Sequence, residues 1–298
     1  MTPAPIALFV YDRPPHTQRT LEALAANTLA ANSDLVVFAD GPRTPAEAAA
    51  VAATRDVVRA ARGFRRRTLI ERPENAGLFR SITDGLGAMA RDHERFIVLE
   101  DDLVTTPDFL RYMNDGLEAY ADTPRVGSIH GYMYPIDGLP DYFFVPGGDC
   151  WGWATWRDRW ELFQPDARAL LQALRARGLV DAFESVGGPQ FSRMLARRAS
   201  GRNQSWAILW HATLVAYERL TLQPGTSFVR NIGMDGSGTH SHETRLFETR
   251  LRQSYQGIHA GPVAPDETAM RKMRAYLAPP GFRSALTRLL AWWSARPL

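Results

Sequence analysis

FIVLEDDLVTTPDFLRY, residues 96–112, joins an apolar strand to three consecutive acids and then to a helix. The apolar run 96–99 predicts a strand buried on both faces, as in a parallel or mixed α/β sheet. Glu100, Asp101 and Asp102 then fall at its carboxyl end, the edge where open α/β sheets bind ligands. Three adjacent carboxylates repel one another, so a divalent cation that bridges them to a phosphate-bearing ligand is the simplest compensation. The pattern favours a metal site over the alternative, a solvated acidic turn.

The chain before this stretch alternates strands with helices. Residues 6–11 and 35–39 are short apolar runs that predict buried strands, each followed by a loop containing proline. Residues 17–29 and 44–63 carry apolar residues near helical spacing and predict the helices between strands. We therefore predict an α/β fold with a mixed, mostly parallel sheet flanked by helices.

Composition places the chain among ordinary globular proteins. At 298 residues and 45% hydrophobic, it can bury one sizeable core, or a core and a small appendage. The net charge of +3 comes almost entirely from arginine, so it is weak evidence for nucleic acid, and we expect no such partner. A single cysteine, Cys150, excludes an internal disulfide and fits a reducing compartment. With no signal-peptide pattern and no apolar run long enough to span a bilayer, we expect a cytoplasmic protein.

A tryptophan-rich stretch, GGDCWGWATW, occupies residues 147–156. Flat indole rings near a glycine-rich backbone are a common platform for the apolar face of a sugar. We assign Trp151 and Trp153 to this platform and place Trp156 and Trp160 in the core. The alternative is that all of these rings are core.

A second glycine-rich segment, NIGMDGSGTH, occupies residues 231–240. Four of its residues 233–238 are glycine or serine, which predicts a loop able to hinge. A loop of this kind that ends in His240 fits a lid over a diphosphate, with the imidazole offered to a cation. The alternative is a flexible surface loop.

These three stretches resemble the GT-A glycosyltransferases, in particular the Golgi N-acetylglucosaminyltransferase I family and its bacterial relatives. In that family an E-D-D-L…P-D-F segment is the counterpart of the DXD motif. The resemblance implies a Rossmann-like GT-A fold in which Glu100 and Asp101 face the nucleotide sugar. It implies that Asp102, with His240, holds the cation, manganese or magnesium, against the diphosphate.

The resemblance also implies the nucleotide pocket. Residues 11–13 shape its wall, and Asp40 accepts a hydrogen bond from the imide of a pyrimidine base, unless residues 40–42 are simply a turn. Asn75 and Gly77 form an N-x-G segment at a strand-to-helix turn that permits close approach of the backbone to an anion. The predicted contacts with the donor or acceptor are therefore Tyr11, Arg13, Asp40, Asn75, Gly77, Arg80, Glu100, Asp101, Trp151, Trp153, Asp235 and Ser237.

The catalytic base does not follow the family pattern. Many inverting relatives place a carboxylate just after the tryptophan of residues 203–220, where this chain has Ala207 and Ile208. We assign the base to Asp149, two residues before Trp151, with Asp235 and Glu243 as alternatives. His211 is interpreted as a core histidine.

The predicted organisation is a GT-A domain of residues 1–240 and a C-terminal helical extension of residues 241–298. The predicted activity is inverting, metal-dependent transfer of a hexosyl or acetylhexosaminyl group from a nucleoside diphosphate sugar, UDP- or another pyrimidine-linked, to a glycan or lipid-linked acceptor. A sugar-nucleotide nucleotidyltransferase and a non-catalytic carbohydrate-binding module are the alternatives. The amphipathic stretch 282–293 has three open roles, which are capping the core, dimer contact and peripheral contact with the inner face of the membrane. The sugar, the nucleotide, the acceptor and the oligomeric state are left open.

Overall fold

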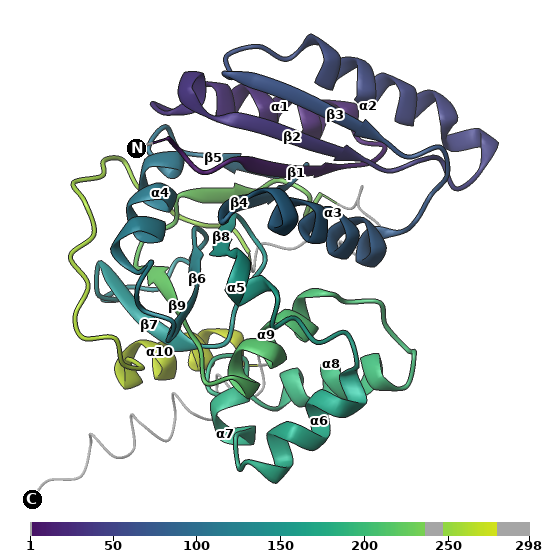
Figure 1. Cartoon of the computed structure of the whole chain (residues 1–298). Helices are drawn as coiled ribbons and strands as arrows, with labels where there is room; N and C mark the ends of the chain where they lie inside the picture. The colour runs from purple at the N-terminus through teal and green to yellow at the C-terminus, as the bar shows by residue number, and fades with distance from the viewer. Residues whose placement is uncertain (1, 236–246, 279–298) are drawn as a thin grey trace, which may run out of the picture.

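A computed structural model of the chain describes residues 2–235 and 247–278. In these residues, an eight-stranded sheet has helices on both faces, and a two-stranded sheet lies beside it (Figure 1). The strands are β1 (Ile6–Val10), β2 (Asp34–Ala39), β3 (Arg66–Glu71), β4 (Arg95–Glu100), β5 (Leu103–Thr105), β6 (Val126–His130), β7 (Tyr142–Pro146), β8 (Trp153–Trp156), β9 (Leu220–Pro224) and β10 (Val229–Asn231). The helices are α1 (Pro14–Ala25), α2 (Ala48–Ala60), α3 (Leu78–Asp92), α4 (Phe109–Ala119), α5 (Arg157–Trp160), α6 (Ala167–Ala176), α7 (Val180–Phe183), α8 (Pro189–Ala199), α9 (Ala207–Ala216) and α10 (Glu267–Leu277).

The large sheet is mixed and mostly parallel, in the order β3-β2-β1-β4-β8-β6-β9-β7. Strands β1 to β4 run parallel, β8 runs antiparallel to both β4 and β6, and β9 is parallel to β6. The chain leaves β1 for β2 on one side and reaches β4 on the other, so the strand order reverses between β1 and β4. Ligands of Rossmann-like folds bind at the carboxyl ends of the strands at such a reversal. The predicted fold class is therefore confirmed.

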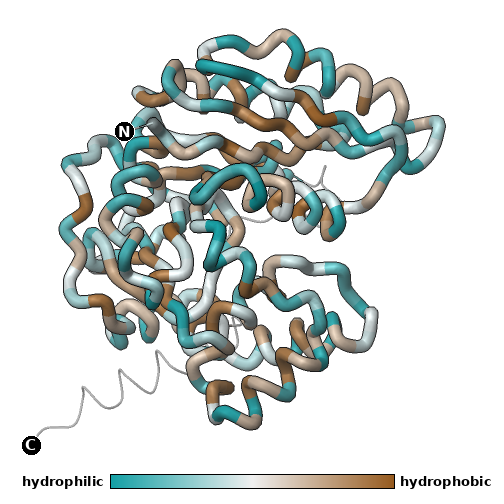
Figure 2. The backbone as a smooth tube through the Cα atoms, in the orientation of Figure 1, coloured by the Kyte–Doolittle hydropathy of each residue, from teal (hydrophilic) through white to brown (hydrophobic). Residues whose placement is uncertain are grey.

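Strand β1 shows how the two faces of the sheet are filled. Ile6, Leu8 and Val10 pack with residues of α1, α2 and α4, whereas Ala7 and Phe9 pack with residues of α3, α5 and α9. Because side chains alternate along a strand, a strand covered on both faces must be apolar at every position. This requirement explains the uninterrupted apolar runs in the sequence, and Figure 2 shows apolar residues concentrated along these strands.

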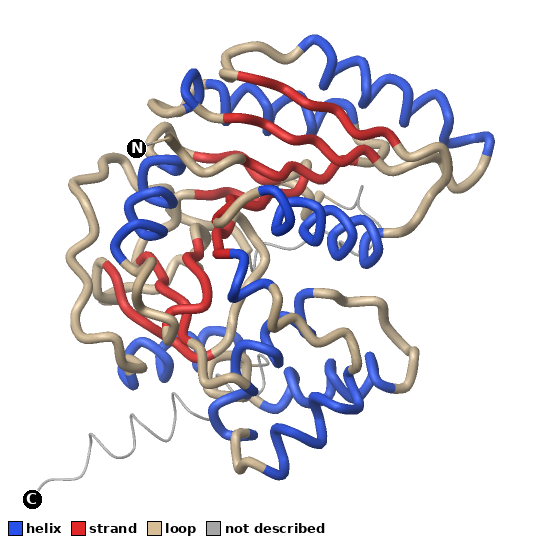
Figure 3. The backbone as a smooth tube through the Cα atoms, viewed as in Figure 1, coloured by secondary structure: helices blue, strands red, loops and turns tan. Residues whose placement is uncertain are grey.

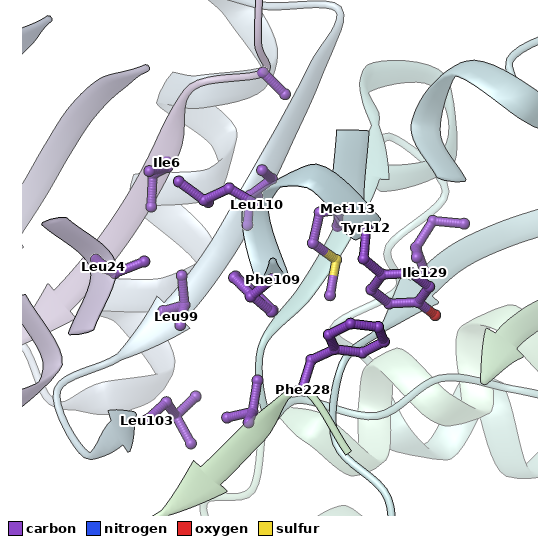
Figure 4. Close-up of a cluster of buried hydrophobic side chains, with 14 of the residues drawn as sticks. Ile6, Leu24, Leu99, Leu103, Phe109, Leu110, Tyr112, Met113, Ile129 and Phe228 are labelled. Carbon is purple, nitrogen blue, oxygen red and sulfur yellow. The ribbon is translucent and has the colours of Figure 1, made fainter. Parts of the chain in front are cut away.

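The core on the α4 face is a continuous cluster that reaches from β1 to β10. Figure 4 shows Phe109, Leu110, Tyr112 and Met113 of helix α4 directed between the strands. The ring of Tyr112 stacks on that of Phe228, with centroids 4.3 Å apart. This packing fixes helix α4 directly after the acidic stretch, so the acids are anchored on both sides by buried residues.

Helices α6 to α9 pack on one another as a helical region beside the sheet (Figure 1 and Figure 3), and α5 follows β8 and contacts α3. Helix α9 is buried along almost its whole length, and it joins this region to the sheet through Trp210, which packs against Trp153 and Trp160. Residues 157–200 hold helices α5 to α8, and helix α9 ends at Ala216, shortly before strand β9 starts at Leu220.

The described part of residues 241–298 is not separate from the sheet. Asp266 donates its backbone N–H to the carbonyl oxygen of Phe144 in β7 at 2.9 Å, and Met270 and Met273 of α10 are buried beside that strand. The predicted amphipathic stretch 282–293 lies outside the described residues. None of the helices in the described ranges combines the length and apolarity needed to cross a membrane.

Candidate functional site

Six chain segments meet at one edge of the large sheet. Parallel strands β1, β2, β4, β6 and β9 all end there, and β8 starts there because it runs the opposite way. The polar residues that this topology brings to the edge are Tyr11, Arg13, Asp40, Glu100, Asp101, Asp102, His130, Asp149 and Gln223. Strand direction alone therefore unites the acidic stretch with the tryptophan-rich stretch.

Arg13 holds the acids that follow β4. Its Nη2 donates to Asp101 Oδ1 at 2.5 Å and to Asp102 Oδ2 at 2.8 Å. The Asp101 side chain is 7% exposed and that of Asp102 15% exposed, so these contacts are shielded from water. The buried hydroxyl of Thr20 donates to the Asp101 carbonyl oxygen at 2.8 Å. Asp101 therefore anchors Arg13 inside the loop, whereas the sequence analysis placed it facing a donor.

Burial and mutual repulsion alter the ionisation of the acids. Burial, followed by the charges of Asp102 and Asp101, raises the pKa of Glu100 to about 8. Burial also raises the pKa of Asp101 to about 6, against the opposing effect of Arg13. The nearby acids raise the pKa of Arg13, which stays charged. Near neutral pH Glu100 is therefore mostly protonated, and two carboxylates, those of Asp101 and Asp102, face one guanidinium. The excess of negative charge favours a bound cation.

The described protein side chains alone do not complete a metal site. In residues 2–235 and 247–278, no three His, Cys, Asp or Glu side chains form a cluster able to hold a metal ion. Asp102 makes its side-chain hydrogen bond through Oδ2, so within these ranges Oδ1 is free to ligate. The donor set fits a cation only if a bound ligand supplies further oxygens, as phosphates do for Mg²⁺. The second predicted metal ligand, His240, lies outside the described residues, as does Ser237.

Residues 231–235 lie directly on the acidic loop. Ile232 donates its N–H to the Asp102 carbonyl oxygen at 2.8 Å, and β10 pairs with β5 next to it. A Cβ at Gly233 would lie 2.1 Å from Asp102 Oδ2, so only glycine permits this approach. His16 Nε2 of helix α1 lies 3.1 Å from Asp235 Oδ2. The start of the predicted lid is therefore fastened to the acids and to α1.

Asp40 joins the loops that follow β2 and β3. Its carboxylate accepts the backbone N–H groups of Ala76 at 2.9 Å and Gly77 at 3.0 Å. Asn75 Nδ2 donates to the Gly41 carbonyl oxygen at 2.9 Å in the opposite direction. Asp40, Asn75 and Gly77 are thus brought together as predicted from sequence, with Asp40 shaping the loop. Contact of Asp40 with a base remains a prediction.

This joint depends on Gly41. A Cβ there would lie 2.5 Å from the backbone carbonyl carbon of Glu74, and neither loop can move away without breaking the Asp40 bonds. We expect Gly41→Ala to lower the free energy of unfolding by roughly 1–3 kcal/mol, as overpacking does. Urea unfolding measures this change. Gly87→Ala in helix α3 is the matched control, because a Cβ there would lie 4.0 Å from the nearest side-chain atom, Arg91 Nη1, and alanine is favoured in a helix. An equal loss of stability in both variants would contradict the role of Gly41.

Tyr11 and Arg80 flank the same edge. The Tyr11 hydroxyl donates to Glu47 Oε2 at 2.5 Å, and burial together with this acid raises the pKa of Tyr11 to about 12. The phenol is therefore a neutral, fixed wall beside Arg13. Arg80 is exposed on the first turn of α3, where it stays available to an anion.

The loop before β8 carries Asp149 between the acids and a group of aromatic rings. Asp149 Oδ1 accepts the Cys150 N–H at 2.7 Å, and its side chain is 38% exposed. Burial and then the charges of Asp149 and Glu100 raise the pKa of the Cys150 thiol. The ring nitrogens of His211 lie 3.0 Å from the carbonyl oxygens of Gly148 and Phe183, so this buried histidine holds the loop from behind.

Trp151 belongs to an aromatic group that lies next to Asp149. Its ring is half-buried and lies edge-on to Tyr132 at 4.7 Å and to Phe247 at 5.1 Å between centroids. Tyr134 continues the group at 5.2 Å from Tyr132. Burial, and after it the charge of Asp149, raises the pKa of both tyrosines. Trp151 therefore lies in a half-buried aromatic group two residues from Asp149, and its contact with a sugar stays a prediction.

The assignment of Trp153 to a sugar platform is wrong. Its side chain is fully buried, with Trp206 and Trp210 at 5.9 and 5.3 Å between ring centroids. The cause is strand β8, which the sequence analysis did not predict and which inserts between β4 and β6 in the middle of the sheet. Trp156 and Trp160 are buried core, as predicted.

Two buried polar residues of the site were missed. His130 ends β6 and Gln223 lies opposite it on β9, with His130 Nδ1 and Gln223 Oε1 2.9 Å apart. A signal for His130 is present in the sequence, because it ends the buried strand β6 and a buried polar group requires hydrogen-bond partners.

Comparisons with known proteins do not assign the chain to a family. No protein-family model matches the chain, and no curated protein matches it. Among solved structures, UDP-glucose pyrophosphorylase complexed with UDP-glucose is similar at a TM-score of 0.29 and 12% identity, over 53% of this chain and 78% of that chain. The fold and the site thus define a Rossmann-like α/β protein with an acidic, aromatic-flanked site at its sheet edge.

Proposed function

We propose that this protein is a metal-dependent GT-A glycosyltransferase that uses a nucleoside diphosphate sugar. One observation carries the proposal: the Arg13-bound acids after β4 and the loop of Asp149 and Trp151 before β8 lie at the same edge of the sheet. The first group suits a phosphate-bearing donor and its cation, and the second suits a carbohydrate acceptor. The resemblance of residues 97–112, 151–156 and 231–240 to the N-acetylglucosaminyltransferase I family supports the same function.

On the donor side, Asp102 is the residue that would hold Mn²⁺ or Mg²⁺ together with the diphosphate oxygens. A bound cation supplies charge stabilisation for the departing diphosphate. Arg13 keeps the Asp102 carboxylate oriented, and Ile232 and Gly233 cover it from the side of β10. Asp40, Asn75 and Gly77 form the wall in which the nucleotide is proposed to lie, and Arg80 is exposed at its rim.

On the acceptor side, Trp151 offers a ring to a sugar and Asp149 offers a carboxylate to its hydroxyl. In the proposed reaction, the acceptor oxygen attacks the anomeric carbon while Asp149 takes its proton. The bond between that carbon and the diphosphate oxygen breaks, and the electron pair leaves with the diphosphate. A single displacement of this kind inverts the configuration.

A donor screen tests the proposal. Wild-type protein is heated with each of a panel of nucleotide sugars, with and without Mn²⁺, and we expect one donor to raise the melting temperature only when the cation is present. Release of the nucleoside diphosphate then measures turnover with glycan acceptors. Formation of pyrophosphate from a nucleoside triphosphate and a sugar 1-phosphate would instead establish a nucleotidyltransferase. Stabilisation by free glycans alone would indicate a carbohydrate-binding module.

Trp151→Ala tests the acceptor assignment. We expect the KM for the acceptor to rise roughly two- to tenfold, because an aromatic contact is worth about 0.5–1.5 kcal/mol beyond its buried area. The metal-dependent melting shift with donor should stay as in the wild type. Trp153→Phe is the control, and it should lower the melting temperature without changing the acceptor KM, since Trp153 lies in the core. An unchanged acceptor KM in Trp151→Ala would remove this residue from the site.

A further inference from the structure

His130 is a buried histidine with one unused ring nitrogen, and it faces the proposed base. The residue is 1% exposed, and its Nδ1 lies 2.9 Å from Gln223 Oε1. Its Nε2 is buried, and none of the described residues offers it a hydrogen bond. The closest charged atom to Nε2 is Asp149 Oδ2, at 4.0 Å. A buried polar atom normally has a partner, so this nitrogen calls for an explanation.

Gln223 determines which nitrogen of His130 carries the proton. The Gln223 oxygen can only accept, so Nδ1 must donate its N–H to it. In the neutral imidazole, Nε2 then carries a lone pair, and it confronts a carboxylate that also only accepts. Two acceptors cannot hydrogen-bond, which accounts for a separation of 4.0 Å where a hydrogen bond would need about 2.7–3.2 Å. A proton placed on either atom would turn the pair into a donor and an acceptor.

We propose that His130 is the positioning residue of Asp149 and accepts a hydrogen bond from it once Asp149 has taken the acceptor proton. The inference rests on the proposed glycosyl transfer. The acceptor O–H bond breaks and its proton goes to Asp149, while the acceptor oxygen bonds to the anomeric carbon and the diphosphate leaves with its electron pair. The protonated Asp149 keeps this proton and donates it as a hydrogen bond to Nε2, and the partly exposed carboxyl releases the proton to solvent after the product leaves.

The surroundings of His130 fit this role. The Tyr112 hydroxyl donates to the His130 carbonyl oxygen at 2.9 Å, and the Tyr132 ring lies edge-on at 6.3 Å between centroids. His130 of β6 lies opposite Trp153 in the neighbouring strand β8. These three neighbours are uncharged, and Asp149 is the charged residue that faces Nε2. Protonation of Asp149 therefore decides whether Nε2 meets a hydrogen-bond donor. Because the hydrogen bond forms only after proton transfer, it acts on kcat and not on substrate binding.

The test combines His130→Gln, Asp149→Asn and the double variant. We expect His130→Gln to lower kcat roughly 10- to 100-fold, as the loss of an orienting partner does, with donor and acceptor KM within about twofold. In the Asp149→Asn background the same substitution should cost nothing further, since the two residues act as one unit. Tyr112→Phe is the matched control, because it removes a buried hydrogen bond to the backbone of His130 and leaves the contact with Asp149 in place.

Three results would overturn the inference: an unchanged kcat in His130→Gln, an equal loss in Tyr112→Phe, or a loss that persists in the Asp149→Asn background. Imidazole ¹⁵N NMR of histidine-labelled protein gives a readout without substrate. We expect Asp149→Asn to shift the His130 resonances and the surface variant Asp56→Asn not to shift them. Shifts at His130 in a protein that turns over no nucleotide sugar would overturn the proposed function and the catalytic role with it, whereas active wild type with an unaffected His130→Gln would overturn the inference alone.

Discussion

Asp102→Asn is expected to abolish metal-dependent donor binding and to lower transfer by about a thousandfold or more, the loss seen when a main source of charge stabilisation is removed. Asp102 has one carboxylate oxygen bound to Arg13 and the other free within the described chain. Asparagine keeps an oxygen for Arg13 but loses the negative charge that a hard cation requires. The measurements are the melting shift given by the donor with Mn²⁺ and the rate of nucleotide release.

The control separates the site from the fold. Asn at 102 preserves the shape of the loop, so the melting temperature without ligand should stay within a few degrees of the wild type. Asp56→Asn removes another carboxylate that pairs with an arginine, on the surface helix α2, and should leave the donor shift unchanged. Wild-type turnover by Asp102→Asn with Mn²⁺ present would show that the cation is held elsewhere.

The sequence predicted strands β1, β2 and β4 of the large sheet closely. Strands buried on both faces need apolar residues at every position, so residues 6–11, 35–39 and 96–99 could be predicted within about two residues. Their loops followed from the topology, because parallel strands end at one edge. This is why Arg13 and Asp102, far apart in sequence, were expected together and are found in contact, with Asp40 at the same edge of the sheet.

The part of the sheet from β8 to β7 could not be predicted in the same way. Strand β8 has four residues, and glycine and tryptophan around it are typical of a loop. It is a strand because β4 and β6 both pair with it, and no local pattern carries that information. Trp153 was therefore assigned to the surface, although the pairing places its ring in the core.

The hydrogen-bond partners of the buried polar groups could not be predicted either. Gln223 is 93 residues from His130, and each is an ordinary polar residue in its own segment. Asp40 was interpreted as a possible base contact because its bonds to Ala76 and Gly77 appear only when two loops meet. The sequence predicts some of the strands that carry such groups, whereas tertiary packing decides which groups form hydrogen bonds with each other.

Asp149→Asn is expected to lower kcat roughly 10²–10⁴-fold, the usual contribution of general-base catalysis, while donor affinity changes little. Asn can still accept the Cys150 N–H that fixes the turn, so the loop should keep its shape. It cannot take a proton, so the loss falls on the transition state. Measuring transfer and donor hydrolysis separately distinguishes the base from a residue that supports the donor. Asp235→Asn is the comparison, because Asp235 pairs with His16 on α1 and is the rival base among the described residues. If Asp235→Asn lowers kcat and Asp149→Asn does not, the base lies in the segment 231–235, next to Asp102. A loss of donor binding as large as the loss of rate in Asp149→Asn would instead place Asp149 in the nucleotide pocket.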